Sequence, residues 1–213
     1  MAGRIKSALI DFGGVLGDFN HMIACQRLSA FSGNNYSAEQ IYAKTFGNSL
    51  EIERQRGEMG GREFFNYCQK NFFLKFRLVS FDVFSVMWGE IFSRHGGMVV
   101  VLDKIRRSGL STYIASNSEE LHWPYVLKIV KDLGFDEDHV LPSYSAHARK
   151  PEQKYYEQAI ELCRCKPEEI LYIDDNAEYV QAFRGLGGQG MVYTNKHLWA
   201  RDFSEKLAEY GVK

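Results

Sequence analysis

The segment IKSALIDFGGVL, residues 5–16, is the stretch from which the fold prediction starts. Its apolar-rich part ends at Ile10 and has the length of a short buried strand. Asp11 closes that strand, and Gly13 and Gly14 directly after it predict a tight turn. The chain is therefore expected to open with a buried strand that presents an acidic side chain at its carboxyl end.

Strand and helix patterns alternate from Gly96 onward. Pro151 is expected in the first turn of one of the helices. Strands that alternate with helices of this length predict βαβ units and a parallel sheet. The expected strands are 111–115, 139–141, 170–173 and 191–193, and the expected helices are 98–107, 119–133, 152–162, 177–183 and 199–210.

Residues 20–95 have a different character. Large apolar residues recur at helical spacing, as at Phe64, Cys68 and Phe72, and glycine and asparagine interrupt the pattern at several points. The pattern contains several helices and no clear strand. This segment therefore predicts an all-helical insertion between the first strand and the rest of the sheet.

Length and composition fit one compact unit with such an insertion. The chain has 213 residues, of which 45% are hydrophobic and 25% charged, which is the usage of an ordinary globular protein. We expect the fold class α/β, with a three-layer Rossmann-like core, a parallel sheet and an inserted all-helical cap. The core is expected over residues 1–16 and 96–213, and the cap over residues 17–95.

Charge and apolar patterning exclude several kinds of partner. Lys and Arg total 26 and Asp and Glu total 27, so the chain lacks the basic surface of a nucleic-acid-binding protein. No apolar run approaches the roughly 18 residues of a membrane helix. The four cysteines are too few and too scattered for a disulfide framework, so we expect a reduced, cytoplasmic protein. No nucleic acid and no membrane is expected as a partner, and the oligomeric state does not follow from the sequence.

Residues 185–190, Gly-Leu-Gly-Gly-Gln-Gly, fit the G-x-G-x-x-G pattern of dinucleotide-binding folds. That pattern binds phosphate when it follows a strand and opens a helix. Here it follows a predicted helix and leads into a predicted strand, which is the reverse order. A helix C-terminal cap followed by a loop is the favoured interpretation.

Polar residues follow several predicted strands at the point where each strand ends. Asp11 closes the first strand, the pair Ser116-Asn117 the second, and the pair Asp174-Asp175 the strand at 170–173, while Lys150 stands directly before Pro151. Each has a local alternative, since Ser116 with Glu119 fits a capping box and Asp174 to Asn176 fits a helix cap. Together they lie where ligands of an open α/β sheet bind.

The chemistry of this set points to phosphoryl transfer. Three carboxylates that converge on one place repel one another unless a cation lies between them, and carboxylates are ligands suited to Mg²⁺. Ser116, backbone N–H groups at a helix start and Lys150 supply hydrogen-bond donors and positive charge for an anion. A carboxylate beside the metal can serve as a nucleophile.

Four sequence segments in this order resemble the motifs of the haloacid dehalogenase (HAD) superfamily. They are IDFGGVL at 10–16, IASN at 114–117, RKP at 149–151 and LYIDDN at 171–176. The helical insertion resembles the type-1 cap of that family. Arg56-Gly57-Glu58 and the stretch 148–156 resemble phosphatases of small sugar phosphates, in particular the α-glucose-1-phosphate phosphatase group.

The resemblance implies a nucleophile and a metal site. Asp11 would attack phosphorus and form an aspartyl-phosphate. Asp11, the backbone carbonyl of Gly13 and Asp175 would bind Mg²⁺, with Asp174 assisting or orienting Lys150. The implied reaction is Mg²⁺-dependent hydrolysis of a small phosphorylated metabolite, such as a sugar phosphate.

The resemblance also implies the phosphate-binding groups. Ser116 and the backbone of Asn117 would hold the phosphoryl oxygens, and Lys150 would neutralise charge as a catalytic residue. Two family alternatives remain open. One is a 2-haloacid dehalogenase, against which the pair Asp174-Asp175 argues because that reaction needs no metal. The other is a degenerate member that binds a phosphorylated ligand or a protein without turnover.

Two positions depart from the family pattern. Most family phosphatases have a second Asp two residues after the nucleophile as general acid and base, and this chain has Gly13 there. Such a group is worth about 10²–10⁴-fold in rate, so turnover is expected to be slow unless Asp18 or His21 replaces it. An Asp or Asn four residues after the metal-binding Asp is also frequent in the family, and here it is Tyr179.

Overall fold

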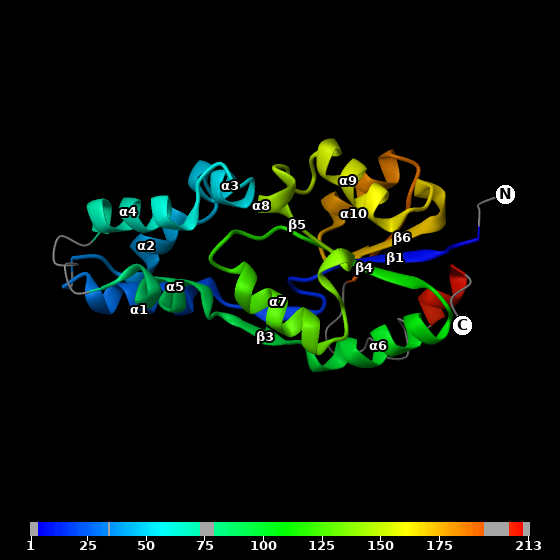
Figure 1. Ribbon diagram of the computed structural model, residues 1–213, viewed down its shortest axis with the longest axis horizontal. Coiled ribbons are helices and arrows are strands. Elements are labelled where there is room, and N and C mark those ends of the chain that lie inside the picture. The colour runs from blue at the N-terminus through cyan, green and yellow to red at the C-terminus, as the bar shows by residue number, and fades with distance from the viewer. Residues whose placement is uncertain (1–3, 34, 73–78, 194–204, 211–213) are drawn as a thin grey trace.

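A computed structural model describes residues 4–33, 35–72, 79–193 and 205–210. The chain forms two lobes that lie end to end (Figure 1). The sheet lobe contains a five-stranded sheet with helices on both sides. In the described residues, the helical lobe contains the helices α1 to α5, within residues 21–89. The described segments nearest the two ends of the chain, residues 4–11 and 205–210, lie at the sheet lobe.

The sheet is parallel and its strands run in the order β5-β4-β1-β6-β7. Every residue of β1 and of β6 is buried, as in the central strands of a parallel sheet that is covered on both faces. The prediction of a parallel α/β sheet is confirmed, and each predicted strand lies within two residues of the observed one. The strands are β1 (Ser7–Asp11), β4 (Ser111–Ser116), β5 (Val140–Pro142), β6 (Ile170–Asp174) and β7 (Gln189–Val192).

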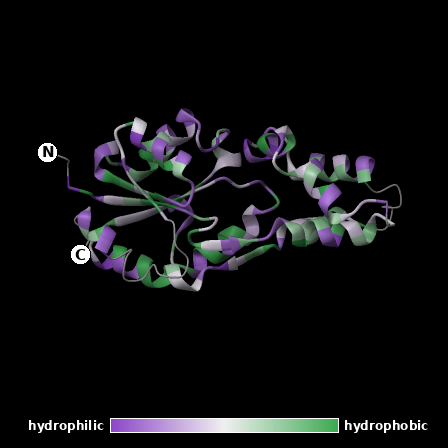
Figure 2. Ribbon diagram, turned by 180° about the vertical axis from the view of Figure 1, so that it is seen from behind, coloured by the Kyte–Doolittle hydropathy of each residue, from purple (hydrophilic) through white to green (hydrophobic). Residues whose placement is uncertain are grey.

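Helices cover both faces of this sheet, which gives the three layers that were predicted (Figure 1). Because side chains alternate along a strand, Ile10 packs in the cluster formed with α6 and α7, and its neighbour Leu9 packs in the cluster formed with α9 and α10. The helices are α6 (Gly96–Arg107) and α7 (Trp123–Asp132) on one face, and α9 (Gln153–Cys163) and α10 (Ala177–Gly185) on the other. Figure 2 shows hydrophilic and hydrophobic segments side by side along these helices, as expected when one face of each is buried.

The helical lobe has its own hydrophobic core, centred on aromatic residues such as Phe64, Phe84 and Trp88. Polar side chains at four of its helix starts accept hydrogen bonds from the first turn, which satisfies backbone N–H groups that have no partner within the helix. These cap residues are Asn20, Ser37, Asn48 and Ser80. The helices are α1 (His21–Phe31), α2 (Ala38–Thr45), α3 (Ser49–Gln55), α4 (Gly61–Phe72) and α5 (Phe81–Gly89).

The prediction that the insertion holds no strand is wrong in one respect. Strands β2 (Gly17–Phe19) and β3 (Phe92–Arg94) pair antiparallel where the chain leaves the sheet lobe and where it returns. Strands of three residues are too short to show the alternation by which strands are recognised, and Phe92 continues the helical spacing of α5. The boundaries expected at residues 16 and 96 stay predictions, and this two-stranded ribbon lies beside both.

Two helix starts differ from the prediction. Helix α7 begins at Trp123 rather than at residue 119, with Pro124 in its first turn, because residues 119–122 form a turn that directs Glu119 into the interior. Helix α9 begins at Gln153, and its N-cap is Glu152. Pro151 therefore precedes the helix instead of standing in its first turn, and the peptide bond before it is cis.

One short helix was not predicted, and one predicted helix lies partly outside the described residues. The short helix α8 (Ser143–Ala146) was not predicted. Of the helix expected at 199–210, residues 205–209 are helical, and residues 199–204 lie outside the described residues. The glycine-rich segment 185–190 ends α10 and enters β7, as expected from its order.

Two further findings bear on the composition. In the described residues, no helix is both long and apolar enough to cross a membrane. All four cysteines are free, and three of them are buried.

Candidate active site

The sheet topology brings the predicted residues together at one edge. Strand β1 lies between β4 and β6, so the side chains at the carboxyl ends of these three strands meet. In the register of the sheet, Asp11 lies opposite Ala115, one residue before Ser116, and Ile10 lies opposite Ile173, one residue before Asp174. Strands far apart in sequence thereby supply one site.

Lys150 lies at the centre of this edge. Its Nζ donates to Oδ1 of Asp11 at 2.6 Å and to Oδ2 of Asp174 at 2.8 Å, and it also lies 3.2 Å from the carbonyl oxygen of Ala115. The side chain is 1% exposed. The backbone around Lys150 is held by Asn117, whose Oδ1 accepts from the Lys150 N–H at 2.8 Å and whose Nδ2 donates to the Lys150 carbonyl at 3.1 Å. Asn117 thus fixes the position of the lysine, a role that sequence reasoning did not give it.

The two neighbouring aspartates are in different surroundings. Asp174 is fully buried, and its oxygens accept from Lys150, from the hydroxyl of Tyr172 and from the backbone N–H of Asn176. Asp175 is exposed, and its carboxylate points back toward the turn after β1. A Cβ on Gly14 would lie 2.2 Å from Asp175 Oδ2, and the φ of Gly14 is +77°, so this position needs glycine on both grounds. Asp174 is therefore held by protein donors, whereas Asp175 lies on the wall of the cavity above Asp11.

The negative charges in this group outnumber the positive ones. Oxygens of Asp11, Asp174 and Asp175 lie within 4.8 Å of one another, and Lys150 is the cation that contacts two of them. Burial raises the pKa of the Asp11 carboxyl to about 7, and the charges of Asp174 and Asp175 add to that shift while Lys150 opposes it. Burial alone lowers the pKa of Lys150, but the carboxylates it contacts outweigh burial and hold its pKa above the usual value. An excess of hard oxygen donors in a dry place fits a divalent cation such as Mg²⁺.

A cavity of about 340 Å³ opens above this group, between the two lobes. Of the predicted site residues, Asp174 alone is absent from its wall, because it lies beneath Lys150. The cavity is lined by Asp11, Phe12, Gly13, Phe19, His21, Phe46, Glu51, Gln55, Phe92, Ser116, Asn117, Ser118, Glu119, His122, Arg149, Lys150, Asp175, Asn176 and Tyr179.

Gly13 faces a ring rather than open space. A Cβ on Gly13 would lie 2.8 Å from the ring of Phe19, so the ring occupies the region where a side chain at position 13 would project. Of the two substitutes considered for the missing general acid, His21 lines the cavity and Asp18 does not. Asp18 and Phe19 are successive residues of β2 and point to opposite sides.

Tyr179 has a place in the site although it departs from the family pattern. It lines the cavity, and its hydroxyl accepts a long hydrogen bond of 3.5 Å from Asn117 Nδ2. The Lys150 Nζ lies 5.3 Å from the centre of the Tyr179 ring. A tyrosine here therefore packs over the Asn117–Lys150 pair instead of supplying a carboxylate.

The structure contains a second buried ion cluster, which the sequence analysis did not predict. Glu119 accepts from Nε of Arg54 at 2.6 Å and from the indole N–H of Trp88, and His122 lies 3.8 Å from the same carboxylate. Burial alone raises the pKa of Glu119, but Arg54, His122 and Trp88 lower it to about 2. Glu119 therefore does not form the capping box with Ser116 that its position in the sequence fits. Its carboxylate binds Arg54 and Trp88 instead. Arg54 and Glu119 are 65 positions apart, and no local pattern could have paired them.

The resemblance to phosphatases of small sugar phosphates rested on residues 56–58 and 148–156, and these two segments contact each other. Arg56, directly after α3, forms an ion pair of 2.7 Å with Glu152 at the start of α9. Gly57 lies against the backbone of Tyr144, where a Cβ would come within 2.3 Å of the carbonyl oxygen. Arg56 and Gly57 are not on the cavity wall, so this motif joins the helical lobe to the sheet lobe.

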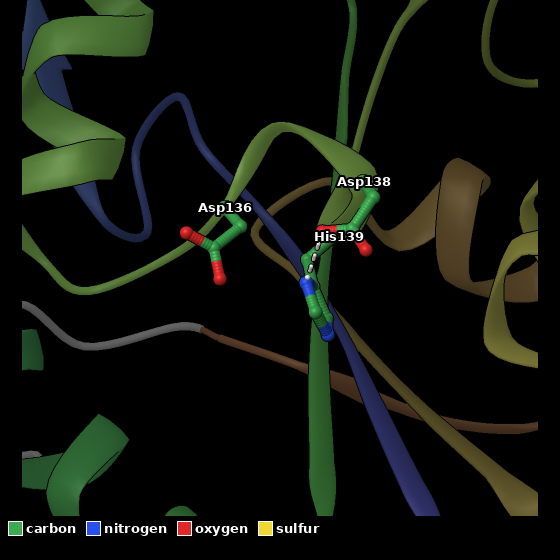
Figure 3. Close-up of side chains that lie close together, drawn as sticks. All are labelled: Asp136, Asp138 and His139. Carbon is green, nitrogen blue, oxygen red and sulfur yellow. Dashed lines mark hydrogen bonds and ion pairs between the residues drawn. The ribbon is translucent and has the colours of Figure 1, made fainter.

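Another group of possible metal ligands lies elsewhere. Asp136, Asp138 and His139 precede β5, at the amino-terminal edge of the sheet and so away from Asp11 (Figure 3). His139 Nδ1 lies 2.8 Å from Oδ1 of Asp138, and both aspartates are exposed. Exposed acidic groups of this kind are common without a metal.

Comparison with known proteins agrees with this geometry. A family model for haloacid dehalogenase-like hydrolases matches residues 5–187. The HAD family enzyme bt-2542 of Bacteroides thetaiotaomicron is 21% identical, with a TM-score of 0.77 over 94% of this chain and 99% of that one. The same enzyme in complex with magnesium and inorganic phosphate is 22% identical, with a TM-score of 0.74 over 93% and 99%. A HAD-like family hydrolase of Porphyromonas gingivalis is 20% identical, with a TM-score of 0.72 over 96% and 98%.

Proposed function

Since this chain belongs to the haloacid dehalogenase-like hydrolases, we propose that it hydrolyses a small phosphate monoester with the help of Mg²⁺ and a covalent phosphate on Asp11. The observation that carries the proposal is the group Asp11–Lys150–Asp174–Asp175 at the floor of a cavity. Its carboxylates outnumber its cation, and the similar enzyme from Bacteroides thetaiotaomicron was crystallised with magnesium and inorganic phosphate.

The residues that would hold the metal are Asp11, Asp175 and the backbone carbonyl of Gly13. Asp174 is the less suitable direct ligand, because Tyr172, Asn176 and Lys150 already occupy its oxygens. Mg²⁺ at this place would offset the carboxylate charge and the charge of a phosphate dianion. Asp174 then acts on the site by holding Lys150.

Asp11 is the nucleophile in this proposal. One of its carboxylate oxygens bonds to phosphorus while the ester P–O bond breaks, and the leaving alcohol takes up a proton. Water then attacks the same phosphorus, gives up a proton, and releases inorganic phosphate and the free carboxylate. Lys150 lies within 2.6 Å of Asp11 Oδ1, where it holds the carboxylate in place and remains charged.

The phosphoryl oxygens would be held by the loop after β4. Ser116 is buried at the strand end and lines the cavity together with Asn117 and Lys150. The Ser116 hydroxyl, the Asn117 backbone N–H and the Lys150 ammonium are then the donors for the phosphate. In this arrangement Asn117 serves twice, through its backbone toward the substrate and through its side chain toward Lys150.

Release of inorganic phosphate from a panel of phosphorylated metabolites tests the proposal. We expect activity with Mg²⁺, none after removal of the metal by EDTA, and recovery when Mg²⁺ is added back. A 2-haloacid should give no halide release in either condition. Metal-independent halide release would favour a dehalogenase, and phosphate binding without turnover of any ester would favour a degenerate, ligand-binding member of the family.

A further inference from the structure

One wall of the cavity is aromatic and is assembled from three separate parts of the chain. Phe19 and Phe92 come from the two strands of the ribbon, where they are cross-strand partners with ring centres 6.1 Å apart. His21 and Phe46 come from the helical lobe, and His122 comes from the turn before α7. All five line the same cavity as Asp11.

Three rings of this wall, those of His21, Phe46 and His122, are held nearly parallel. The ring of Phe19 is tilted by 39° to that of His21, and the ring of Phe92 by 49° to that of Phe19. His21 stacks on Phe46 with centres 3.9 Å apart and an angle of 10° between the planes. Phe46 stacks in turn on Trp88 at 5.1 Å and 2°, and His122 lies 5.9 Å from Trp88 at 5°. The indole N–H of Trp88 is bound by Glu119, which fixes the stack from behind. A flat ring of a bound substrate would therefore meet aromatic rings whose orientation is already fixed.

Polar groups on the helical-lobe side of the cavity are mostly engaged within the protein. Oε2 of Glu51 accepts from the backbone of Gly47 at 2.7 Å, and its Oε1 accepts from Gln55 Nε2 at 3.1 Å. The oxygens of Glu119 are taken by Arg54 and Trp88. Gln55 Oε1 and His122 Nε2 are buried without a hydrogen-bond partner in the described part of the chain.

From this wall we infer that the preferred substrate is a phosphate monoester whose leaving group carries a flat, unsaturated ring. The inference rests on the proposed hydrolysis of a phosphate monoester. The phosphate would lie at Ser116 and Lys150, and the ring would lie against Phe19, His21 and Phe46. A cavity of about 340 Å³ is near the lower end of the roughly 300–1,000 Å³ of small-molecule sites, so it suits one ring and a phosphate.

A matched pair of esters isolates the contribution of ring shape. Benzyl phosphate and cyclohexylmethyl phosphate have the same number of carbon atoms and similar leaving alcohols, and they differ in whether the ring is flat. We expect kcat/KM to be about 2- to 10-fold higher for benzyl phosphate, the range of aromatic pair energies beyond buried area. Equal values, a preference for cyclohexylmethyl phosphate, or a higher kcat/KM for glucose 1-phosphate than for benzyl phosphate would overturn the inference.

Two phenylalanine variants provide the matched control. Phe19 is 45% exposed and lines the cavity, while Phe31 is 48% exposed and is not among the lining residues. Phe19→Leu should remove most of the preference for benzyl phosphate, and Phe31→Leu should leave it unchanged. Loss of the preference in both variants, or in neither, would contradict a role for the aromatic wall.

Binding of analogues that cannot be hydrolysed separates this inference from the proposed function. Calorimetry in the presence of Mg²⁺ would compare 2-phenylethylphosphonate with 2-cyclohexylethylphosphonate. Tighter binding of the phenyl compound, reduced in Phe19→Leu, supports the aromatic wall even if no ester is turned over, in which case only the hydrolysis fails. Equal binding, or no binding of either compound, overturns the inference.

Discussion

Two buried ion clusters in the described part of the chain differ in charge balance and in what surrounds them. The sheet-lobe cluster, Asp11–Lys150–Asp174, has more carboxylates than cations and opens to the cavity. The interface cluster, Arg54–Glu119 with Trp88 and His122, pairs one cation with one anion. The Arg54 guanidinium lies over the rings of Phe46, Phe64 and Trp88, at 4.2 to 5.4 Å from their centres.

This difference in charge balance indicates that one cluster takes part in the reaction and that the other holds the two lobes in position. A buried group with excess negative charge is costly unless a ligand completes it, which suits a site that takes up a cation and a phosphate. A balanced pair covered by aromatic rings is complete as it stands. The interface cluster therefore fixes the helical lobe and the aromatic wall relative to the sheet lobe, and the sheet-lobe cluster is where a reaction can occur.

The largest expected effect is at the nucleophile. Asp11→Asn keeps the shape of the side chain but removes the attacking carboxylate and one charge, so phosphatase activity should fall by about 10⁴-fold or more. The melting temperature without metal should not fall, because one of several mutually repelling carboxylates is lost. Phosphate release and thermal unfolding measure the two effects. An Asn variant with wild-type turnover would remove Asp11 from the mechanism.

The absence of a side chain at Gly13 tests whether the chemistry is confined to the sheet-lobe cluster. With no general base at that position to take the proton of the attacking water, the second step should be slow, and rapid-quench labelling should show a burst of covalent phosphate near one per site. If His21 accepts that proton instead, no burst will appear and His21→Phe will reduce the rate by about 10²-fold or more. Because His21 stacks beside His122, that result would extend the chemistry into the interface cluster.

The two adjacent aspartates sharpen the assignment within the sheet-lobe cluster. Asp175→Ala should raise the Mg²⁺ concentration for half-maximal activity by at least about 10-fold and abolish the stabilisation of the fold by Mg²⁺. Asp174→Ala should instead lower stability by about 3 kcal/mol, because Lys150 loses a buried partner. Metal titrations of activity and of melting temperature distinguish the two. Equal responses in both assays would mean that the pair is assigned wrongly.

Glu119→Gln should change stability rather than chemistry. The pKa of Glu119 is lowered from 4.5 to about 2, so the ionised form contributes stability that is complete above pH 4.5 and is lost as the pH falls toward 2. At 1.36 kcal/mol per pH unit this amounts to about 3 kcal/mol, which the variant should lack at pH 7. Urea unfolding between pH 2 and pH 7 measures it. A variant that kept the wild-type pH slope in this window would show that Glu119 is not the group responsible.

The smallest effect is expected for an exposed ion pair of similar length. Lys131 and Glu137 lie 2.6 Å apart, with side chains 52% and 66% exposed. Glu137→Gln should change the unfolding free energy by less than about 1 kcal/mol, because water screens the pair. This variant is the control for Glu119→Gln. A loss as large as that at Glu119 would mean that burial does not explain the difference between the two carboxylates.

The sequence indicated the sheet lobe and most of the candidate site. Strands β1 and β6 are short apolar-rich runs, and Asp11, Ser116 and Asp174 each occupy the last position of a strand. Carboxyl ends of neighbouring parallel strands lie at one edge, so local patterns were sufficient to bring these residues together. The same reasoning erred where an element was too short to show a period, as in the ribbon, and where a side chain turned inward, as at Glu119.

The order of the elements and the polar residues at the strand ends could be predicted from the sequence, because short runs of residues carry those features. The tertiary structure alone decided that Lys150 joins Asp11 to Asp174, that Arg54 pairs with Glu119, and that aromatic rings from three segments share a wall. Asp11 and Lys150 are 139 positions apart, and Arg54 and Glu119 are 65 apart. Such contacts depend on how whole layers and lobes pack against one another, and local periodicity does not record that packing.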